Sequence, residues 1–167
     1  MKSSTHHILQ MRIDTPLGPL LAARSQEGLS GLWFDGQRHH PGELAAPQGQ
    51  DALLGRLAAE IAGYFEGKAF DAGLLECLDP VGTSFQREVW RALLAIPPGA
   101  TQSYGALAAM LGRPSAVRAV GAAVGRNPIS IVIPCHRVLG ADGGLTGYAG
   151  GLERKEALLA LEGARFH

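Results

Sequence analysis

The most informative stretch of the second half of the chain is Ile131-Val132-Ile133-Pro134-Cys135-His136-Arg137-Val138. Its first three residues are apolar and β-branched, which predicts a short buried strand. Pro134 restricts the backbone directly after that strand. We therefore expect the thiol of Cys135 to be held in a defined position at the end of a buried strand.

Cys135 is one of two cysteines in the chain, and its neighbour His136 is the nearest candidate base. A free thiol has a pKa near ~8.5, so only a few per cent is thiolate at neutral pH. A base, a cation or a helix N-terminus must raise that fraction if the sulfur is to act as a nucleophile. Adjacent strand residues point to opposite faces, so a contact between the two side chains requires a turn or a bridging water. The alternative is that Cys135 is only a small buried hydrophobic residue. For Arg137 we expect a structural role, as a partner in a salt bridge.

Helix signals precede this segment. Thr83-Ser84-Phe85-Gln86 has the pattern of a capping box. An apolar stripe follows it, made of Phe85, Val89, Trp90, Leu93 and Leu94. Ser103 is placed to cap a short helix over 104–111, and Pro114-Ser115 precede a second helix over 116–124. Two short helices joined by a Gly/Pro turn are typical of a helix-turn-helix.

The second of these helices carries few long side chains. Its residues Ala119, Gly121 and Ala122 are small. The long side chain that this helix carries before Arg126 is Arg118. A smooth helix with one projecting cation fits close approach to a groove better than base-by-base readout. Small residues are equally suited to tight packing inside a domain, and the two roles can belong to opposite faces.

The first half of the chain has an α/β pattern with little sign of chemistry. Three strands and one helix are predicted, at residues 8–13, 20–23, 29–34 and 52–65. Residues 37–50 have the composition of a loop. Asp79-Pro80-Val81-Gly82 is a candidate linker, so we place a scaffold domain at 1–80 and a second domain, which carries the chemistry, at 81–167.

Composition is typical of a globular protein. The 167 residues are 46% hydrophobic and 18% charged, and they suffice for one domain or two small ones. The N-terminus, Met1 to His7, lacks the apolar core of a secretion signal, and no apolar run near Cys135 is long enough to span a bilayer. Two cysteines provide no disulfide framework. We expect a soluble cytoplasmic protein.

Net charge is zero for the whole chain but differs between its halves. Residues 1–80 carry 6 Lys/Arg and 10 Asp/Glu, a net charge of −4, whereas residues 81–167 carry 9 Lys/Arg and 5 Asp/Glu, a net charge of +4. A polyanion senses charge within roughly one Debye length, ~8–10 Å, so it would sense the positive half. The asymmetry permits nucleic-acid binding without establishing it, because charge also scatters by chance.

The histidine pairs His6-His7 and His39-His40 are the other candidates for chemistry. Nothing at metal-ligand spacing accompanies them, and two cysteines cannot supply a sulfur-rich zinc site. We therefore expect no metal site, and solvated surface at both pairs.

A series of short motifs resembles methylated-DNA–protein-cysteine methyltransferases (O6-alkylguanine-DNA alkyltransferases). The similarity runs from Ser84 to Gly163 and is carried by Phe85-Gln86, Val89-Trp90, Ser103-Tyr104, Arg118-Ala119-Val120-Gly121, Asn127-Pro128, Ile133 to Val138, Gly147-Tyr148, Gly150-Gly151-Leu152 and Leu158 to Gly163. Before residue 84 only the general pattern is similar, as at Thr15-Pro16-Leu17-Gly18-Pro19. The resemblance implies an α+β chain in two parts: a small ribonuclease-H-like α/β domain, then a mostly helical domain with the helix-turn-helix.

The resemblance implies that Cys135 accepts an alkyl group irreversibly from O6-alkylguanine in DNA, with O4-alkylthymine as a further candidate. His136 matches the histidine that deprotonates the thiol through a water, and Glu162 matches the carboxylate that orients it, as in a Cys-His-acid triad. Asn127 matches the asparagine that steadies the active-site turns. Tyr104 matches the tyrosine that helps to stabilise the leaving guanine. No cofactor is implied.

The resemblance also implies how DNA is bound. The helix that carries Arg118 docks in the minor groove of double-stranded DNA, with Ser115, Ala119, Gly121 and Ala122 at the contact. The alkylated nucleotide is rotated out of the stack, at a cost of a few kcal/mol, and Arg118 fills the space that it leaves. The protein is expected to act as a monomer.

The loop from Gly143 to Gly151 is expected to close one side of the base pocket. The pocket residues implied are Tyr148, Ala149, Val138 and Ser130. The backbone N–H of Ala149 matches a donor to O6, whereas ordinary aromatic packing is the alternative for Tyr148. Ser130 stands where some relatives have proline, a departure that bears on the size of adduct accepted.

Three other functions compete with this one. A module that binds alkylated DNA without transfer is the main alternative, but relatives of that kind replace the acceptor cysteine, and Cys135 is present. A helix-turn-helix transcription regulator predicts base-reading side chains, which the alanine-rich helix lacks. A papain-like protease is excluded, because its nucleophile context and distant histidine are absent. We predict a single-turnover DNA-repair methyltransferase.

Overall fold

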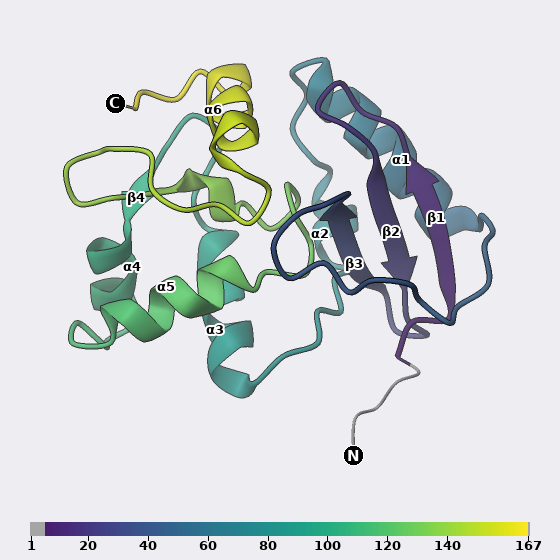
Figure 1. Ribbon diagram of the computed structural model, residues 1–167, viewed down its shortest axis with the longest axis horizontal. Coiled ribbons are helices and arrows are strands. Elements are labelled where there is room, and N and C mark those ends of the chain that lie inside the picture. Colours follow the sequence, from purple (N-terminus) through teal and green to yellow (C-terminus); the bar gives the residue numbers. More distant parts are fainter. Residues whose placement is uncertain (1–5, 167) are drawn as a thin grey trace. The chain divides into compact units, whose positions relative to one another are not determined.

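The computed structural model describes residues 6–166 and divides the chain into two compact units, one ending at Val81 and the other beginning at Gly82 (Figure 1). The first unit combines a sheet with helices, and the second is mostly helical. The predicted α+β fold is thus confirmed. The expectation about the N-terminal sequence falls largely on residues 1–5, which lie outside the described residues.

The first unit is built on an antiparallel sheet of three strands in the order β1-β2-β3. Their bounds are Leu9–Ile13 for β1, Leu20–Arg24 for β2 and Leu29–Phe34 for β3. All six residues of β3 are buried, in keeping with its run of apolar residues. The register pairs Ile13 with Leu20 and Leu20 with Phe34, so these apolar side chains lie together in the core. The three strands lie where the sequence predicts them.

A helix packs against this sheet. Helix α1, Ala52–Phe65, has the predicted bounds and contacts β2 (Figure 1). Asp51 caps it by accepting from the backbone N–H of Leu54 at 3.0 Å, a bond that also lowers the pKa of the Asp51 carboxyl. The buried face is formed by Leu54, Leu57, Ile61 and Tyr64. A single further turn, α2 at Ala72–Leu75, was not foreseen from the sequence.

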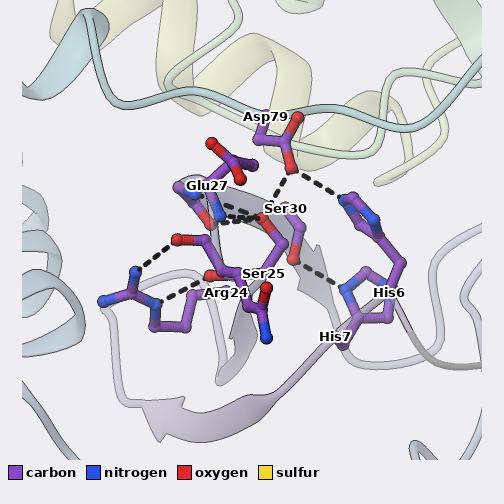
Figure 2. Close-up of polar contacts among 9 residues, drawn as sticks. His6, His7, Arg24, Ser25, Glu27, Ser30 and Asp79 are labelled. Carbon is purple, nitrogen blue, oxygen red and sulfur yellow. Dashed lines mark hydrogen bonds and ion pairs between the residues drawn. The ribbon is translucent and has the colours of Figure 1, made fainter.

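A polar network joins His6, Ser25 and Asp79 (Figure 2). His6 Nε2 lies 2.9 Å from Asp79 Oδ2, and the Ser25 hydroxyl donates to the same oxygen at 2.5 Å. Ser25 Oγ also accepts from the backbone N–H groups of Glu27 and Gly28, both at 3.1 Å. In a nucleophilic serine the imidazole contacts the hydroxyl, whereas here the carboxylate lies between the two. The network is therefore structural and closes the turn between β2 and β3.

His7 is also part of the packed structure. Its Nδ1 lies 2.7 Å from Ser30 Oγ, and its ring meets that of Trp33 edge-on (Figure 2). Burial lowers the pKa of His7. The expectation of solvated surface at His6-His7 is therefore wrong, because both side chains are half-buried by contacts that sequence spacing does not reveal. Of the second pair, His39 is exposed as expected, whereas His40 is half-buried and its ring centroid lies 6.3 Å from that of Trp33.

Four helices and one short strand pair form the second unit. They are α3 at Ser84–Leu93, β4 at Gln102–Ser103, α4 at Tyr104–Met110, α5 at Val117–Gly125, β5 at Val138–Leu139 and α6 at Leu152–Leu161. The predicted capping box is confirmed: Thr83 Oγ1 accepts from Gln86 N at 3.1 Å, and Gln86 Oε1 accepts from Thr83 N at 3.0 Å. Ser103 caps α4 as predicted, by accepting from Ala106 N at 3.0 Å.

The core of this unit lies between α3 and α5. Trp90 is buried and donates from Nε1 to the carbonyl of Ala123 at 2.8 Å. The apolar stripe on α3 faces the buried side of α5, which consists of Val120, Ala123 and Val124. Among residues 6–166 no helix has both the length and the apolar character needed to cross a membrane.

The capping box of α3 makes a stability prediction. Thr83→Ala removes the acceptor of the Gln86 N–H, and losses of this kind cost ~1 kcal/mol. We expect the free energy of unfolding of the full chain to fall by about that amount, measured by urea denaturation followed by far-UV circular dichroism. Ser84→Ala removes the neighbouring exposed hydroxyl and is the matched control. Equal losses in the two variants would contradict the capping role.

Candidate active site around Cys135

A tight turn leads into Cys135, and the strand predicted at 131–133 is wrong. Ile131 has a φ of 71°, in the left-handed region that β-branched residues rarely adopt. The amide of Ile133 bonds back to the carbonyl of Ile129 at 3.0 Å, as in a turn. Ile131 is fully buried, so the core holds a backbone conformation that costs about 1–3 kcal/mol by itself. Burial, and not strand pairing, explains why this run is apolar.

Asn127 fixes this turn and contacts the sulfur. Its Oδ1 accepts from Ile129 N at 2.9 Å, and its Nδ2 donates to the carbonyl of Ile133 at 2.8 Å and to Cys135 Sγ at 3.1 Å. Burial raises the pKa of the Cys135 thiol, while the Asn127 bond and the charge of Lys155 act in the opposite direction. The site therefore favours the thiol when empty but contains groups that stabilise a thiolate.

The two residues after Cys135 both bind Glu162, which caps the end of α6. Cys135–Arg137 forms a short 3₁₀ turn, η1. His136 Nε2 lies 2.9 Å from Glu162 Oε2, and Arg137 donates from Nε and Nη2 to the two oxygens of the same carboxylate, both at 2.8 Å. The salt bridge expected for Arg137 is confirmed.

His136 is a buried imidazole with one free ring nitrogen. It is fully buried, and burial lowers its pKa although Glu162 opposes the shift. The tautomer that satisfies the contact with Glu162 carries its proton on Nε2. Nδ1 then offers a lone pair, and it has no hydrogen-bond partner among residues 6–166. The ring can accept a proton at that atom.

A short parallel strand pair brings Tyr104 to this region. In it Gln102 pairs with Val138 and Ser103 with Leu139, so the start of α4 lies beside the segment that follows η1. Burial raises the pKa of the half-buried Tyr104, a bond with the Thr146 side chain opposes this, and the charge of Cys135 adds to it. Tyr104 thus lies near both the sulfur and the loop, and its hydroxyl carries its proton at neutral pH, as that of an ordinary tyrosine does.

A buried lysine holds the loop, and the sequence analysis missed it. Lys155 Nζ donates to the carbonyls of Val138 at 2.6 Å, Thr146 at 2.7 Å and Gly147 at 3.2 Å. Of the predicted pocket residues, Val138 and Ser130 are buried, whereas Tyr148 and Ala149 are half-buried. The available signal was spacing: Lys155 precedes Leu158 and Leu159 by three and four residues, which is the buried side of α6. No group of three or more His, Cys, Asp or Glu side chains in the described chain is placed to hold a metal ion.

The predicted DNA-contact residues divide between two sides of α5. Ser115, Arg118, Ala119 and Ala122 are exposed. Ser115 lies in the turn before α5, whereas Ala122 follows Arg118 by four residues and Ala119 by three, so these three share one face of the helix. Gly121 is half-buried, and a Cβ built on it would lie 3.7 Å from Cδ1 of Tyr104. Ala119 and Ala122 thus leave an open surface beside Arg118, whereas Gly121 faces Tyr104 at a distance where a Cβ would make ordinary van der Waals contact.

Comparison with known proteins identifies the family. Residues 84–164 match the 6-O-methylguanine DNA methyltransferase DNA-binding domain. Methylated-DNA–protein-cysteine methyltransferases of Mycolicibacterium paratuberculosis and Salmonella typhimurium are 46% and 48% identical to the chain, over 90% and 93% of its length and 89% and 96% of theirs. The chain belongs to this family. It is accordingly a DNA-binding methyltransferase of DNA repair whose acceptor is a cysteine, and the alternative of binding without transfer is not supported.

Solved structures agree with this family assignment. The crystal structure of Mycobacterium tuberculosis OGT in complex with DNA has a TM-score of 0.83 at 43% identity, covering 93% of both chains. The O6-methylguanine-DNA methyltransferase of Pyrococcus kodakaraensis strain KOD1 has a TM-score of 0.69 at 26% identity, covering 93% of this chain and 99% of its own. The two-part fold is thus that of the methyltransferase family.

The buried neutral His136 makes a pH prediction. Its pKa in the folded chain lies below the ordinary 6.5, so the unfolded chain binds the proton more readily. The stability that this group contributes is present above that value and is lost as the pH falls. We expect the free energy of unfolding to fall less between about pH 7 and about pH 5 in His136→Gln than in the unmodified chain, measured by urea denaturation.

The control for this measurement is Arg38→Gln, which removes an exposed charge of the first unit and should keep the pH dependence of the unmodified chain. An equally steep loss of stability in His136→Gln would show that His136 is not a buried neutral group.

Proposed function

We propose that Cys135 accepts the alkyl group of O6-alkylguanine in DNA by direct displacement. The observation that supports this proposal is the contact between the sulfur of Cys135 and Asn127, next to His136 and the carboxylate of Glu162. The sulfur forms a bond to the alkyl carbon while the carbon–O6 bond breaks, and the bonding electrons leave with guanine. The other cysteine, Cys77, lies in the first unit and donates to the carbonyl of Gly73 at 3.3 Å. A thioether is a poor leaving group, so each chain reacts once.

His136 is proposed to take the thiol proton. Nδ1 is the atom available for this, and it acts through a bridging water. Glu162 holds the imidazole in the tautomer that leaves Nδ1 unprotonated, and it stabilises the imidazolium that forms. Arg137 binds the same carboxylate with two bonds and keeps it fixed.

Tyr104 is proposed to assist departure of the guanine. Displacement puts negative charge on the base, and a protonated hydroxyl at this point donates to it. The place of Tyr104 at the start of α4, beside the segment that follows η1, supports this role, and its hydroxyl is protonated at neutral pH like that of an ordinary tyrosine. The backbone N–H of Ala149 is the proposed donor to O6, with Tyr148, Val138 and Ser130 forming the rest of the pocket.

Helices α4 and α5 are proposed to be a helix-turn-helix that docks α5 in the minor groove of double-stranded DNA. The open face around Arg118 supports this, since small side chains let the helix backbone approach closely. The methylated base lies inside the duplex stack, so it must be rotated out to meet a buried sulfur. Arg118, which is exposed and lies among small neighbours, is proposed to fill the space left in the stack.

The first unit is proposed to be a ribonuclease-H-like scaffold. Its three antiparallel strands followed by α1 support this, and none of the proposed reacting groups comes from it. The residues proposed for transfer all belong to the second unit of one chain, which supports a monomer. Two free cysteines fit the reducing cytoplasm.

Methyl transfer to Cys135 is the direct test. Incubation of the full chain with a duplex that contains O6-methylguanine should leave Cys135 one methyl group heavier and Cys77 unchanged, read by intact-protein and peptide mass spectrometry. Cys135→Ser is the matched control and should gain no mass. A methyl group on Cys77, or no gain in mass at all, would refute the assignment.

The role of Arg118 predicts a difference between two substrates. Arg118→Ala should slow transfer from a duplex by about tenfold or more, because unstacking costs a few kcal/mol and the arginine recovers part of it. Transfer from free O6-benzylguanine needs no extrusion and should be nearly unchanged. Arg91→Ala, which removes an exposed arginine of α3, is the control. Equal slowing with both substrates would remove the proposed role in extrusion.

A further inference from the structure

The helix pair α4–α5 lies in a stretch of sequence that carries positive charge and no acidic residue. Between Glu88 and Asp142 there is no aspartate, glutamate or lysine, and the residues of fixed charge are five arginines. They are Arg91, Arg113, Arg118, Arg126 and Arg137. A polyanion that approaches this stretch meets cations without carboxylates that would repel it.

Two of these arginines already have an anionic partner. Arg137 is buried and bound to the carboxylate of Glu162. Arg113 lies in the turn between α4 and α5, where its Nη2 is 3.3 Å from Oε2 of Glu88 and its guanidinium lies over the ring of Phe85. The charges of these two arginines are therefore balanced inside the second unit.

The arginines at the two ends of α5 have no such partner. Arg118 lies in the first turn of the helix, and Arg126 is its C-cap residue (Figure 1). Both are exposed, and neither forms an ion pair with a carboxylate in the part of the chain that the structure describes. At about 3.6 residues per turn, these two side chains and those of Ala119 and Ala122 fall within about 100° of arc around the helix axis. They form one face, with alanines in the middle and an arginine at each end, about 12 Å apart along the axis.

Such a face suits a helix that lies against the minor groove of DNA. The groove is about 6 Å wide, whereas a helix with its side chains is about 10–12 Å across, so small side chains are needed for the backbone to come close. Long cationic side chains at the two ends can then reach the phosphates that line the groove. A basic residue at a helix C-terminus also interacts favourably with the helix dipole, but that effect does not depend on the face on which the residue lies.

We propose that Arg126 binds a backbone phosphate of double-stranded DNA at the C-terminal end of α5, so that the helix is held at both ends. The inference rests on the proposed docking of α5 in the minor groove, in which Arg118 enters the base stack. Arg126 directly precedes Asn127, whose side chain contacts Cys135 Sγ at 3.1 Å. The phosphate contact therefore holds the end of the helix that leads to the sulfur. It carries no sequence information, as repair at any sequence requires.

The salt dependence of DNA binding tests this contact. Each phosphate that a protein cation neutralises contributes about −0.9 to the slope of log K against log salt concentration. For Arg126→Gln we expect a slope that is shallower by about 0.9, and binding that is about eightfold weaker near ~0.1 M salt. The measurement is fluorescence anisotropy of a labelled unmodified duplex, titrated with the full chain over a series of salt concentrations.

Two further variants control for the charge and for its position. Arg126→Lys keeps a cation that can bind a phosphate, so it should keep the slope of the unmodified chain. Arg91→Gln removes an exposed arginine from the side of α3 opposite its buried residues Val89, Trp90 and Leu93, and it should leave the slope unchanged. If Arg126 only stabilised the end of the helix, Arg126→Gln would lower the free energy of unfolding without changing the slope. That result would overturn the proposal.

The kinetics of transfer provide a second readout. A phosphate contact made equally before and during the reaction contributes to binding and not to the chemical step. With an O6-methylguanine duplex far below saturation, transfer by Arg126→Gln should slow by the factor by which binding weakens. At saturating duplex its rate constant should stay within about twofold of the unmodified chain. A slower rate constant at saturation, with unchanged affinity, would contradict the proposed contact.

Ala122→Glu separates a failure of this inference from a failure of the proposed docking. It places a carboxylate in the middle of the same face, and it should weaken duplex binding by about tenfold or more. If Ala122→Glu binds the duplex as tightly as the unmodified chain, α5 does not face DNA, and both proposals are refuted. If Ala122→Glu weakens binding while Arg126→Gln keeps the full salt slope, the docking stands and the contact of Arg126 alone is refuted. The anisotropy measurements need no methyl transfer, so they test Arg126 whether or not Cys135 is the acceptor.

Discussion

The carboxylate of Glu162 is the interaction on which the site depends, because two consecutive residues of η1 bind it. His136 and Arg137 reach the same side chain, and Arg137 also donates to the carbonyl of Ile96 at 2.6 Å. Lys155 lies seven residues before Glu162, two helical turns or about 10 Å along α6, and therefore on the same face. Helix α6 and its C-cap thus hold the reactive segment at two points. The carboxylate of Glu162 binds His136, and the ammonium of Lys155 binds the loop.

Most of these buried charges add little to stability. A buried ion pair roughly breaks even against its desolvation, although removing one partner costs about 3–5 kcal/mol. The left-handed backbone of Ile131 likewise does not stabilise the fold: it costs energy, and the surrounding core maintains it. The apolar contacts between α3 and α5, with Trp90 at their centre, compensate for these costs. The second unit therefore separates its stabilising core from the segment that carries the chemistry.

The sequence predicts local structure well where local signals exist. The period of α1, the capping box at Thr83 and the cap at Ser103 are short-range patterns, and their helices lie where expected. The strand expected at 131–133 failed because an apolar β-branched run indicates burial and not a backbone conformation. Contacts between segments that lie far apart in the chain could not be predicted from local patterns. Examples are the two-residue pair β4–β5 and the bonds of Lys155. Family motifs located Cys135, His136 and Glu162, yet a lysine that contacts only backbone carbonyls left no motif beyond its place on the buried side of α6.

The raised pKa of Cys135 becomes understandable if each chain can react only once. An exposed thiolate would be consumed by any small electrophile, and the protein could not be recovered. Burial keeps the sulfur protonated and shielded, whereas Asn127, Lys155 and the neutral His136 stand ready to stabilise or accept the charges that form. A thiolate of higher pKa is also the stronger nucleophile once it exists. The buried thiol thus reacts slowly with other electrophiles, and the site gains selectivity for its substrate. Such a site needs charged groups that are already in place, and a thiol that loses its proton only when the base and the alkyl carbon are both within reach.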